Sequence, residues 1–208
     1  MEHKNIVATI YLKDGQAVAS MKDFTPVEDV YKLCQLYNDS GIDKIIIFDL
    51  STSDEEHEKN IHTIENINRN IEIKVCAGGN INRLEDVKKL LYAGCKKAVL
   101  DYEKESNIEI TEEVSLKFGK DKILISYNDP SVLELHKEKI EKYISAMILM
   151  NPHQIRETQA ILSLPFFVQI NQVALNKLLE IFAYENVCGV TGNTINDNVK
   201  EIVALKDL

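Results

Sequence analysis

Apolar, β-branched runs alternate with amphipathic helical stretches along this chain, and the pattern repeats eight times. The clearest run is Ile45-Ile46-Ile47-Phe48, an unbroken apolar stretch typical of a parallel strand buried on both faces. Eight strand and helix units joined by right-handed crossovers close into a barrel, whereas an open doubly wound sheet usually stops at about five or six strands. The sequence therefore predicts a (β/α)8 TIM barrel, and 208 residues predict a small one with short loops, in a single domain spanning 1–208.

Turn and capping signals give the expected boundaries. Thr25-Pro26-Val27-Glu28 predicts a capping box with proline at the first helical position, and Gly41 predicts the end of that helix. The second helix is expected to begin near Ser53 and to bury Ile61, Ile64 and Ile67. Strands are expected at 5–11, 44–50, 71–77, 97–100, 122–126, 146–150, 165–169 and 187–191, and the later helices from 82, at 111–118, from 129, from 151, at 176–183 and at 198–205.

Charge and composition exclude several classes of function. The chain has 33 acidic and 24 basic residues, so its net charge of −9 makes nucleic acid a poor partner. No segment approaches the roughly 20 apolar residues of a membrane helix, and the start is not a signal peptide, so we expect a cytoplasmic protein with no membrane partner.

Cysteine and histidine spacing gives no sign of a metal site. The four cysteines show no C-x-x-C pattern and are expected to be small buried hydrophobes in a reducing compartment. The five histidines are scattered, and His57 and His62 lack the i, i+4 spacing of a helical metal pair. All five are therefore expected on the solvated surface, and neither a metal nor a cofactor is expected.

The working face of a TIM barrel lies at the carboxyl ends of its strands, so candidate residues follow each strand. Asp49 ends an otherwise apolar strand, where its carboxylate would mark the rim of a polar cavity. An aspartate that fixes the following turn at Ser51 is the equal alternative. Asp101 and Asp129 are the other candidate carboxylates.

Two glycine-containing turns are candidate phosphate sites. Gly78-Gly79-Asn80 separates a buried strand from a helix, where backbone N–H groups can bind a phosphate. A tight turn that needs glycine only for steric reasons is the equal alternative. Gly192-Asn193 is the second candidate, and there a plain helix cap is the favoured interpretation.

Six short motifs in the first 126 residues form a recognisable set. They are Lys13-Asp14-Gly15, Tyr37-Asn38, Phe48-Asp49, Gly78-Gly79-Asn80-Ile81, Leu84-Glu85-Asp86 and Leu90-Leu91-Tyr92-Ala93-Gly94. These motifs resemble the histidine-biosynthesis barrels, and most nearly the cyclase subunit of imidazole glycerol phosphate synthase. The resemblance is weaker beyond Ser126.

The resemblance implies an acid and a base that this chain lacks. In the family, aspartates at the ends of strands one and five exchange protons with a ribulose-derived bisphosphate; the matching positions here are Tyr11 and Asn128. An amide does no acid–base work, and a phenol titrates far above neutrality. The position that binds a phosphate after strand four in the family is matched here by Asp101-Tyr102. The family also has a ring of charged residues that admits ammonia at the opposite face of the barrel. The matching positions in this chain are Asn5, Lys44 and Lys97, and strand six has no acidic residue there.

The second strand is followed by the run Asp49-Leu50-Ser51 with Ser53-Asp54-Glu55-Glu56-His57-Glu58. This run resembles a shortened cyclase-like domain found ahead of phosphoribosyl-AMP cyclohydrolase and phosphoribosyl-ATP pyrophosphohydrolase modules. The resemblance implies either a stand-alone copy of that domain or the amino-terminal part of a longer bifunctional chain, in which any hydrolase activity belongs to the downstream modules. The first hypothesis is a degenerate barrel that acts as a scaffold or accessory domain with a histidine-pathway protein partner. The second is an enzyme or sensor that binds a phosphorylated ribose-type ligand, a sugar monophosphate, at the barrel mouth.

Overall fold

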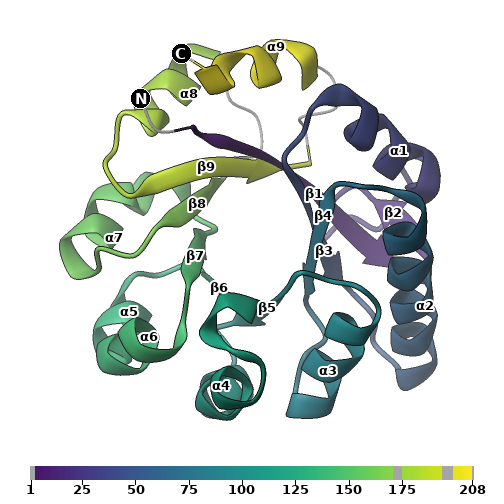
Figure 1. Cartoon of the computed structure of the whole chain (residues 1–208), viewed down its shortest axis with the longest axis horizontal. Helices are drawn as coiled ribbons and strands as arrows, with labels where there is room; N and C mark the ends of the chain where they lie inside the picture. Colours follow the sequence, from purple (N-terminus) through teal and green to yellow (C-terminus); the bar gives the residue numbers. More distant parts are fainter. Residues whose placement is uncertain (1–2, 171–174, 194–198, 208) are drawn as a thin grey trace.

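The computed structural model describes residues 3–170, 175–193 and 199–207, and its strands form one closed barrel (Figure 1). Within these ranges, eight parallel strands follow one another in chain order, and the last pairs with the first, with Ile6 opposite Val190. The predicted (β/α)8 fold is confirmed. The parallel strands are β1 (Asn5–Lys13), β3 (Lys44–Asp49), β4 (Lys74–Gly78), β5 (Lys97–Asp101), β6 (Ile123–Tyr127), β7 (Ala146–Leu149), β8 (Phe166–Gln169) and β9 (Val187–Gly192).

Helices connect consecutive strands along the outside of the barrel (Figure 1). None of the described helices is long and apolar enough to cross a membrane. They are α1 (Val30–Ser40), α2 (Asp54–Asn70), α3 (Leu84–Tyr92), α4 (Glu105–Phe118), α5 (Ser131–Leu135), α6 (Lys137–Tyr143), α7 (Ile155–Ile161), α8 (Leu175–Phe182) and α9 (Val199–Val203), with short 3-10 turns at Lys120–Lys122, Pro152–Gln154 and Ala204–Asp207.

The first strand is longer than expected because the chain turns back after it and forms a β-hairpin. Asp14 (φ 49°) and Gly15 (φ 75°) both adopt left-handed backbone conformations, as a two-residue hairpin turn requires. The chain then forms β2 (Gln16–Val18), which pairs antiparallel with β1 so that Tyr11 lies opposite Val18. This hairpin adds an antiparallel edge at the carboxyl-terminal mouth of the barrel.

The predicted capping box at Thr25-Pro26 is wrong. Pro26 instead forms an isolated antiparallel bridge with Val18, which extends the hairpin region. The helix begins at Val30, and its N-cap is Asp29, whose side chain accepts hydrogen bonds from the backbone N–H groups of Tyr31 and Lys32. The end at Gly41 is confirmed, because Gly41 is the left-handed C-cap.

Other boundaries differ in the second half of the chain. Helix α4 includes the stretch 111–118 on which it was expected to be centred, but it begins earlier, at Glu105. The helix expected after Asp129 is divided at His136 into α5 and α6. The last helix begins at Val199, and Asn198, where it was expected to begin, lies outside the described residues.

Alternation along the strands divides the core into two apolar layers. On β1, Ile6, Ala8 and Ile10 belong to the layer between strands and helices. Val7 and Tyr11 belong to a smaller cluster inside the barrel, where they meet side chains such as Phe48. The barrel is therefore filled by side chains, and its two mouths are where a ligand can enter.

Candidate functional site

A cavity of about 480 Å³ opens at the carboxyl ends of the strands, which is the working face of this fold. Its walls include apolar side chains such as Phe24, Phe48 and Met150. The ionisable and polar residues that line it are Asp49, Ser51, Asn80, Asp101, Glu103, Lys104, Ser126, Tyr127 and Asn128.

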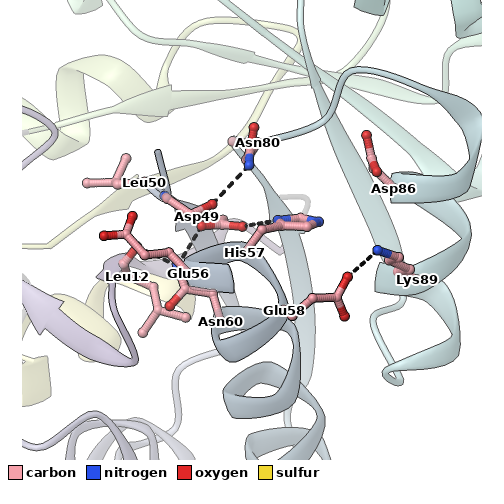
Figure 2. A network of polar contacts seen from close by, with 12 residues as sticks. Leu12, Asp49, Leu50, Glu56, His57, Glu58, Asn60, Asn80, Asp86 and Lys89 are labelled. Carbon is pink, nitrogen blue, oxygen red and sulfur yellow. Dashed lines mark hydrogen bonds and ion pairs between the residues drawn. The ribbon is translucent and has the colours of Figure 1, made fainter. Parts of the chain in front are cut away.

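Asp49 is buried at the end of β3 and is the centre of a hydrogen-bond network (Figure 2). Its Oδ1 accepts hydrogen bonds from the backbone N–H of Ser51 at 2.8 Å and from Nδ2 of Asn60 at 2.6 Å. Its Oδ2 lies 2.6 Å from Nδ1 of His57. These contacts fix the turn between β3 and α2, so the carboxylate serves the local structure even though it also lines the cavity.

His57 is buried, so the expectation that every histidine lies at the solvated surface is wrong for this residue. It occupies the first turn of α2 on the face that packs against the barrel, and its Nδ1–H donates to Asp49. The hydrogen bond with Asp49 raises the pKa of His57, and burial opposes that shift. The Nε2 atom has no hydrogen-bond partner among the described residues, and the ring points toward α3, which carries Asp86 and Lys89 (Figure 2).

The glycine pair after β4 has a steric explanation in the structure. A Cβ on Gly78 would lie 2.3 Å from the carbonyl oxygen of Val99. Gly79 has a φ of 108°, and its Cβ would lie 2.2 Å from the carbonyl oxygen of Asp49. Asn80 follows and donates from Nδ2 to the Ser51 hydroxyl at 3.0 Å. The turn after β4 is therefore packed directly against the turn after β3, whatever it binds.

The turn after β5 supplies the cation of the cavity. Lys104 donates from Nζ to the carbonyl oxygen of Gly79 at 3.0 Å. Asp101 is half-buried, and its Oδ1 accepts from the backbone N–H of Glu103 at 3.1 Å. Buried Asn107 supports both turns, because its Oδ1 accepts from the backbone N–H of Asp101 and its Nδ2 donates to the carbonyl oxygen of Ile81.

Tyr11 and Asn128 occupy different environments. Tyr11 is buried inside the barrel, stacks on Phe48 with ring centroids 6.0 Å apart, and accepts from Gln169 at 3.4 Å. Burial raises the pKa of its phenol. Asn128 is exposed after β6, the fifth strand of the barrel, and lines the large cavity, whereas Tyr11 lines a separate small one of about 50 Å³.

The remaining candidates lie apart from the cavity. Asp129 is exposed, and its carboxylate accepts from the backbone N–H of Ser131 at the start of α5, which lowers its pKa. Gly192 ends β9, where a Cβ would lie 2.3 Å from the carbonyl oxygen of Ile170. Asn193 donates from Nδ2 to the carbonyl oxygen of Ala19 at 2.6 Å. These three residues therefore have structural contacts of their own, and none of them lines the cavity that Gly79 lines.

Sequence reasoning missed Glu103 and Lys104, which line the cavity from the turn after β5. The available signal was their position, because these two charged residues follow Asp101 in the same turn at the carboxyl end of a predicted strand. No cluster of three or more metal-ligating side chains occurs among the residues that the structure describes.

Comparison with known proteins agrees with this architecture. The family model for the histidine biosynthesis protein family matches residues 5–162, most of the chain, and the chain belongs to that family of TIM barrels. Relatives include the imidazole glycerol phosphate synthase subunit HisF of Staphylococcus aureus strains Newman, COL and MRSA252, each 30% identical over 135 residues. The match covers 62% of this chain and 54% of each relative, so it spans about half of their length.

Proposed function

We propose that this chain is a cyclase-like barrel without cyclase activity, which acts as a scaffold or accessory domain for a phosphoribosyl-AMP cyclohydrolase/phosphoribosyl-ATP pyrophosphohydrolase. Membership of the histidine biosynthesis family supports the pathway. The observation that carries the loss of activity is the environment of Tyr11, a buried phenol at the position where the resemblance places a catalytic aspartate.

Proton transfer requires two groups that titrate near neutrality and reach the same substrate. The phenol of Tyr11 has a raised pKa, so it stays protonated at neutral pH, and its contacts with Phe48 and Gln169 hold it inside the barrel. Asn128 carries an amide, which neither accepts nor releases a proton in this pH range. Tyr11 is buried inside the barrel and Asn128 is exposed at its mouth, so the two positions do not offer a matched acid and base to one substrate.

The charge of the carboxyl-terminal mouth also disfavours a bisphosphate. Three carboxylates, those of Asp49, Asp101 and Glu103, line this cavity beside the single lysine Lys104. Like charges in a partly enclosed cavity repel more strongly than in bulk water, because the effective dielectric constant is lower. A substrate with two phosphates would therefore meet a net negative surface.

The association is tested by mixing the purified chain with the cyclohydrolase/pyrophosphohydrolase of the same organism. Size-exclusion chromatography with light scattering should show a stable complex, and the hydrolase should melt at a higher temperature when the barrel is bound, because binding to the folded state stabilises it. An authentic HisF subunit serves as the control barrel. Separate elution of the two proteins, with unchanged melting and activity, would contradict the proposal.

A second candidate function is the binding of a sugar monophosphate at the same mouth. The contact that favours it is Lys104 Nζ on the Gly79 carbonyl oxygen, since this places one ammonium group beside the Gly79-Asn80 backbone. Calorimetry with ribose 5-phosphate tests it, with sulfate as the comparison anion. Saturable binding that Lys104→Met removes would support this function, whereas equal binding by K104M would exclude this turn as the site.

A further inference from the structure

The amino-terminal mouth of the barrel holds a second cavity of about 490 Å³, which the proposed function does not use. It lies where the strands begin, at the end opposite to the Asp49 cavity. Five lysines line it, and the one carboxylate in its lining is that of Asp121. The lysines are Lys44, Lys74, Lys96, Lys97 and Lys122.

The excess of positive charge in this cavity is opposite in sign to the net charge of the whole chain. The protein carries a net charge of −9, and its other mouth has three carboxylates and one lysine. A concentration of ammonium groups in one cavity of an acidic protein costs electrostatic free energy unless an anion compensates it. The amino-terminal mouth should thus attract an anion more strongly than the carboxyl-terminal mouth.

Lys44 and Lys97 are half-buried at the first positions of β3 and β5. Lys44 donates from Nζ to Oδ1 of Asn5 at 2.9 Å and lies 5.0 Å from the ring centroid of Phe167. Lys97 donates from Nζ to the Ser145 hydroxyl at 2.8 Å. These partners are neutral, so they orient the two ammonium groups without cancelling their charge.

No carboxylate forms an ion pair with Lys44 or Lys97 among the described residues. Asp121 lies 3.4 Å from Lys122, the neighbouring lysine, and is itself exposed. Burial lowers the pKa of Lys97, the nearby charges of Lys44 and Lys122 act in the same direction, and Cys76 and Asp121 act in the opposite direction. A bound anion would reverse this effect, because an opposite charge favours the protonated lysine.

The wall of the cavity becomes apolar toward the barrel interior. Val7 follows Asn5 by two residues on β1, and Ile46 follows Lys44 by two residues on β3, so both side chains point inward above the mouth. Leu124 and Phe167 continue this apolar wall. A volume of about 490 Å³ lies within the range typical of small-molecule sites, about 300–1,000 Å³.

We propose that the amino-terminal mouth is a binding site for a small polyvalent oxyanion of the phosphate class, with Lys44 and Lys97 as its central ligands and Lys74, Lys96 and Lys122 around them. Ammonium groups bind phosphate as point charges, and several of them favour a dianion over a monovalent ion. The apolar wall gives room for the organic group of a phosphomonoester.

Titration of the full chain with inorganic phosphate and with phenyl phosphate at low ionic strength tests the site. Calorimetry should show one saturable site, and amide signals of Lys97, Ser145 and Cys76 should shift in NMR spectra, rather than those of Gly79 and Asn80. Tighter binding of phenyl phosphate would identify an organic phosphomonoester as the ligand, and equal affinity would identify inorganic phosphate. Absence of saturable binding for both would overturn the proposal.

Variants locate the site and control for simple changes in charge. The double variant K44Q/K97Q should weaken binding at least tenfold, and the exposed pair K74Q/K96Q should weaken it severalfold. K32Q/K117Q removes two exposed charges on α1 and α4 and should leave the affinity unchanged. Binding that survives K44Q/K97Q with unchanged affinity, or that disappears in K104M, would refute the assignment. Since K74Q/K96Q alters exposed side chains, it remains informative if K44Q/K97Q does not fold.

Discussion

Asp49→Asn should destabilise the protein strongly, and by an amount that depends on pH. Asp49 is 3% exposed, and its carboxylate accepts hydrogen bonds from three donors, on Ser51, His57 and Asn60. The amide keeps one acceptor oxygen but replaces the other with an NH2 group beside His57. Loss of a buried, charge-assisted contact predicts a decrease of about 3 kcal/mol in the free energy of unfolding at pH 6.

The pH dependence follows from the raised pKa of His57. A group with a folded pKa above its ordinary value of 6.5 stabilises the protein fully below that value, and this stabilisation is lost as pH rises through the folded pKa. The cost of D49N in the free energy of unfolding should therefore be smaller at pH 9 than at pH 6. The sign of this difference is the informative quantity.

Urea unfolding followed by circular dichroism measures both values. The matched control is Asp14→Asn, which removes an exposed ion pair with Lys59 and should change the stability by less than about 1 kcal/mol. Two outcomes would refute the assignment of Asp49 and His57 as a buried ion pair. One is an equal decrease in the free energy of unfolding for D49N and D14N, and the other is a larger decrease for D49N at pH 9 than at pH 6.

Further predictions concern the glycine turn, the support of the mouth, the thiols and the lost acid and base. Gly79→Ala should lower the free energy of unfolding in urea by about 3 kcal/mol, and Gly15→Ala should lower it by about 1 kcal/mol. The reason is that a Cβ at Gly79 meets backbone atoms, whereas a Cβ at Gly15 meets the flexible Lys59 side chain. Equal decreases for the two variants would contradict this explanation. Asn107→Leu should lower the free energy of unfolding by about 2–4 kcal/mol, since it leaves the backbone N–H of Asp101 and the carbonyl oxygen of Ile81 without their partner. An unchanged melting temperature would contradict the supporting role of Asn107. Cys34 and Cys95, whose pKa values burial raises to about 12, should not react with a disulfide reagent at pH 8 until urea unfolds the chain, and rapid labelling of the native protein would disagree. The double variant Y11D/N128D, checked for folding by circular dichroism, should gain no cyclase activity, because the mouth still has three carboxylates beside one lysine and so disfavours a bisphosphate.

The barrel could be predicted because its signal is repeated. Each buried strand is a continuous apolar run such as Ile45 to Phe48, and such runs need cover on both faces. In a barrel the helices cover the outer face, and side chains from the other strands fill the inside. The hairpin was missed although Asp14-Gly15 is a strong two-residue turn signal. The helix start at Pro26 was predicted from the local capping pattern alone, whereas the bridge between Pro26 and Val18 depends on the hairpin.

The polar network of the mouth was predictable only in part. Asp49 was found because a carboxylate at the end of an apolar strand needs compensation. His57 was assigned to the surface, yet His57 and Asn60 continue the helical face of Ile61, Ile64 and Ile67, and this spacing was the available signal. The ring of lysines at the other mouth depends on strand register, because Lys44, Lys74 and Lys97 become neighbours only when their strands align.

The central claim, that this family member keeps the barrel without the cyclase chemistry, is tested most directly by a steady-state assay of the purified chain. The assay supplies the ribulose-derived bisphosphate substrate of the cyclase with an excess of ammonium salt and follows the release of imidazole glycerol phosphate, with the Staphylococcus aureus HisF subunit as the positive control. We expect no product above the rate without protein, because a buried phenol and an exposed amide stand where proton transfer is required. Turnover at a rate comparable to that of the control would contradict the account.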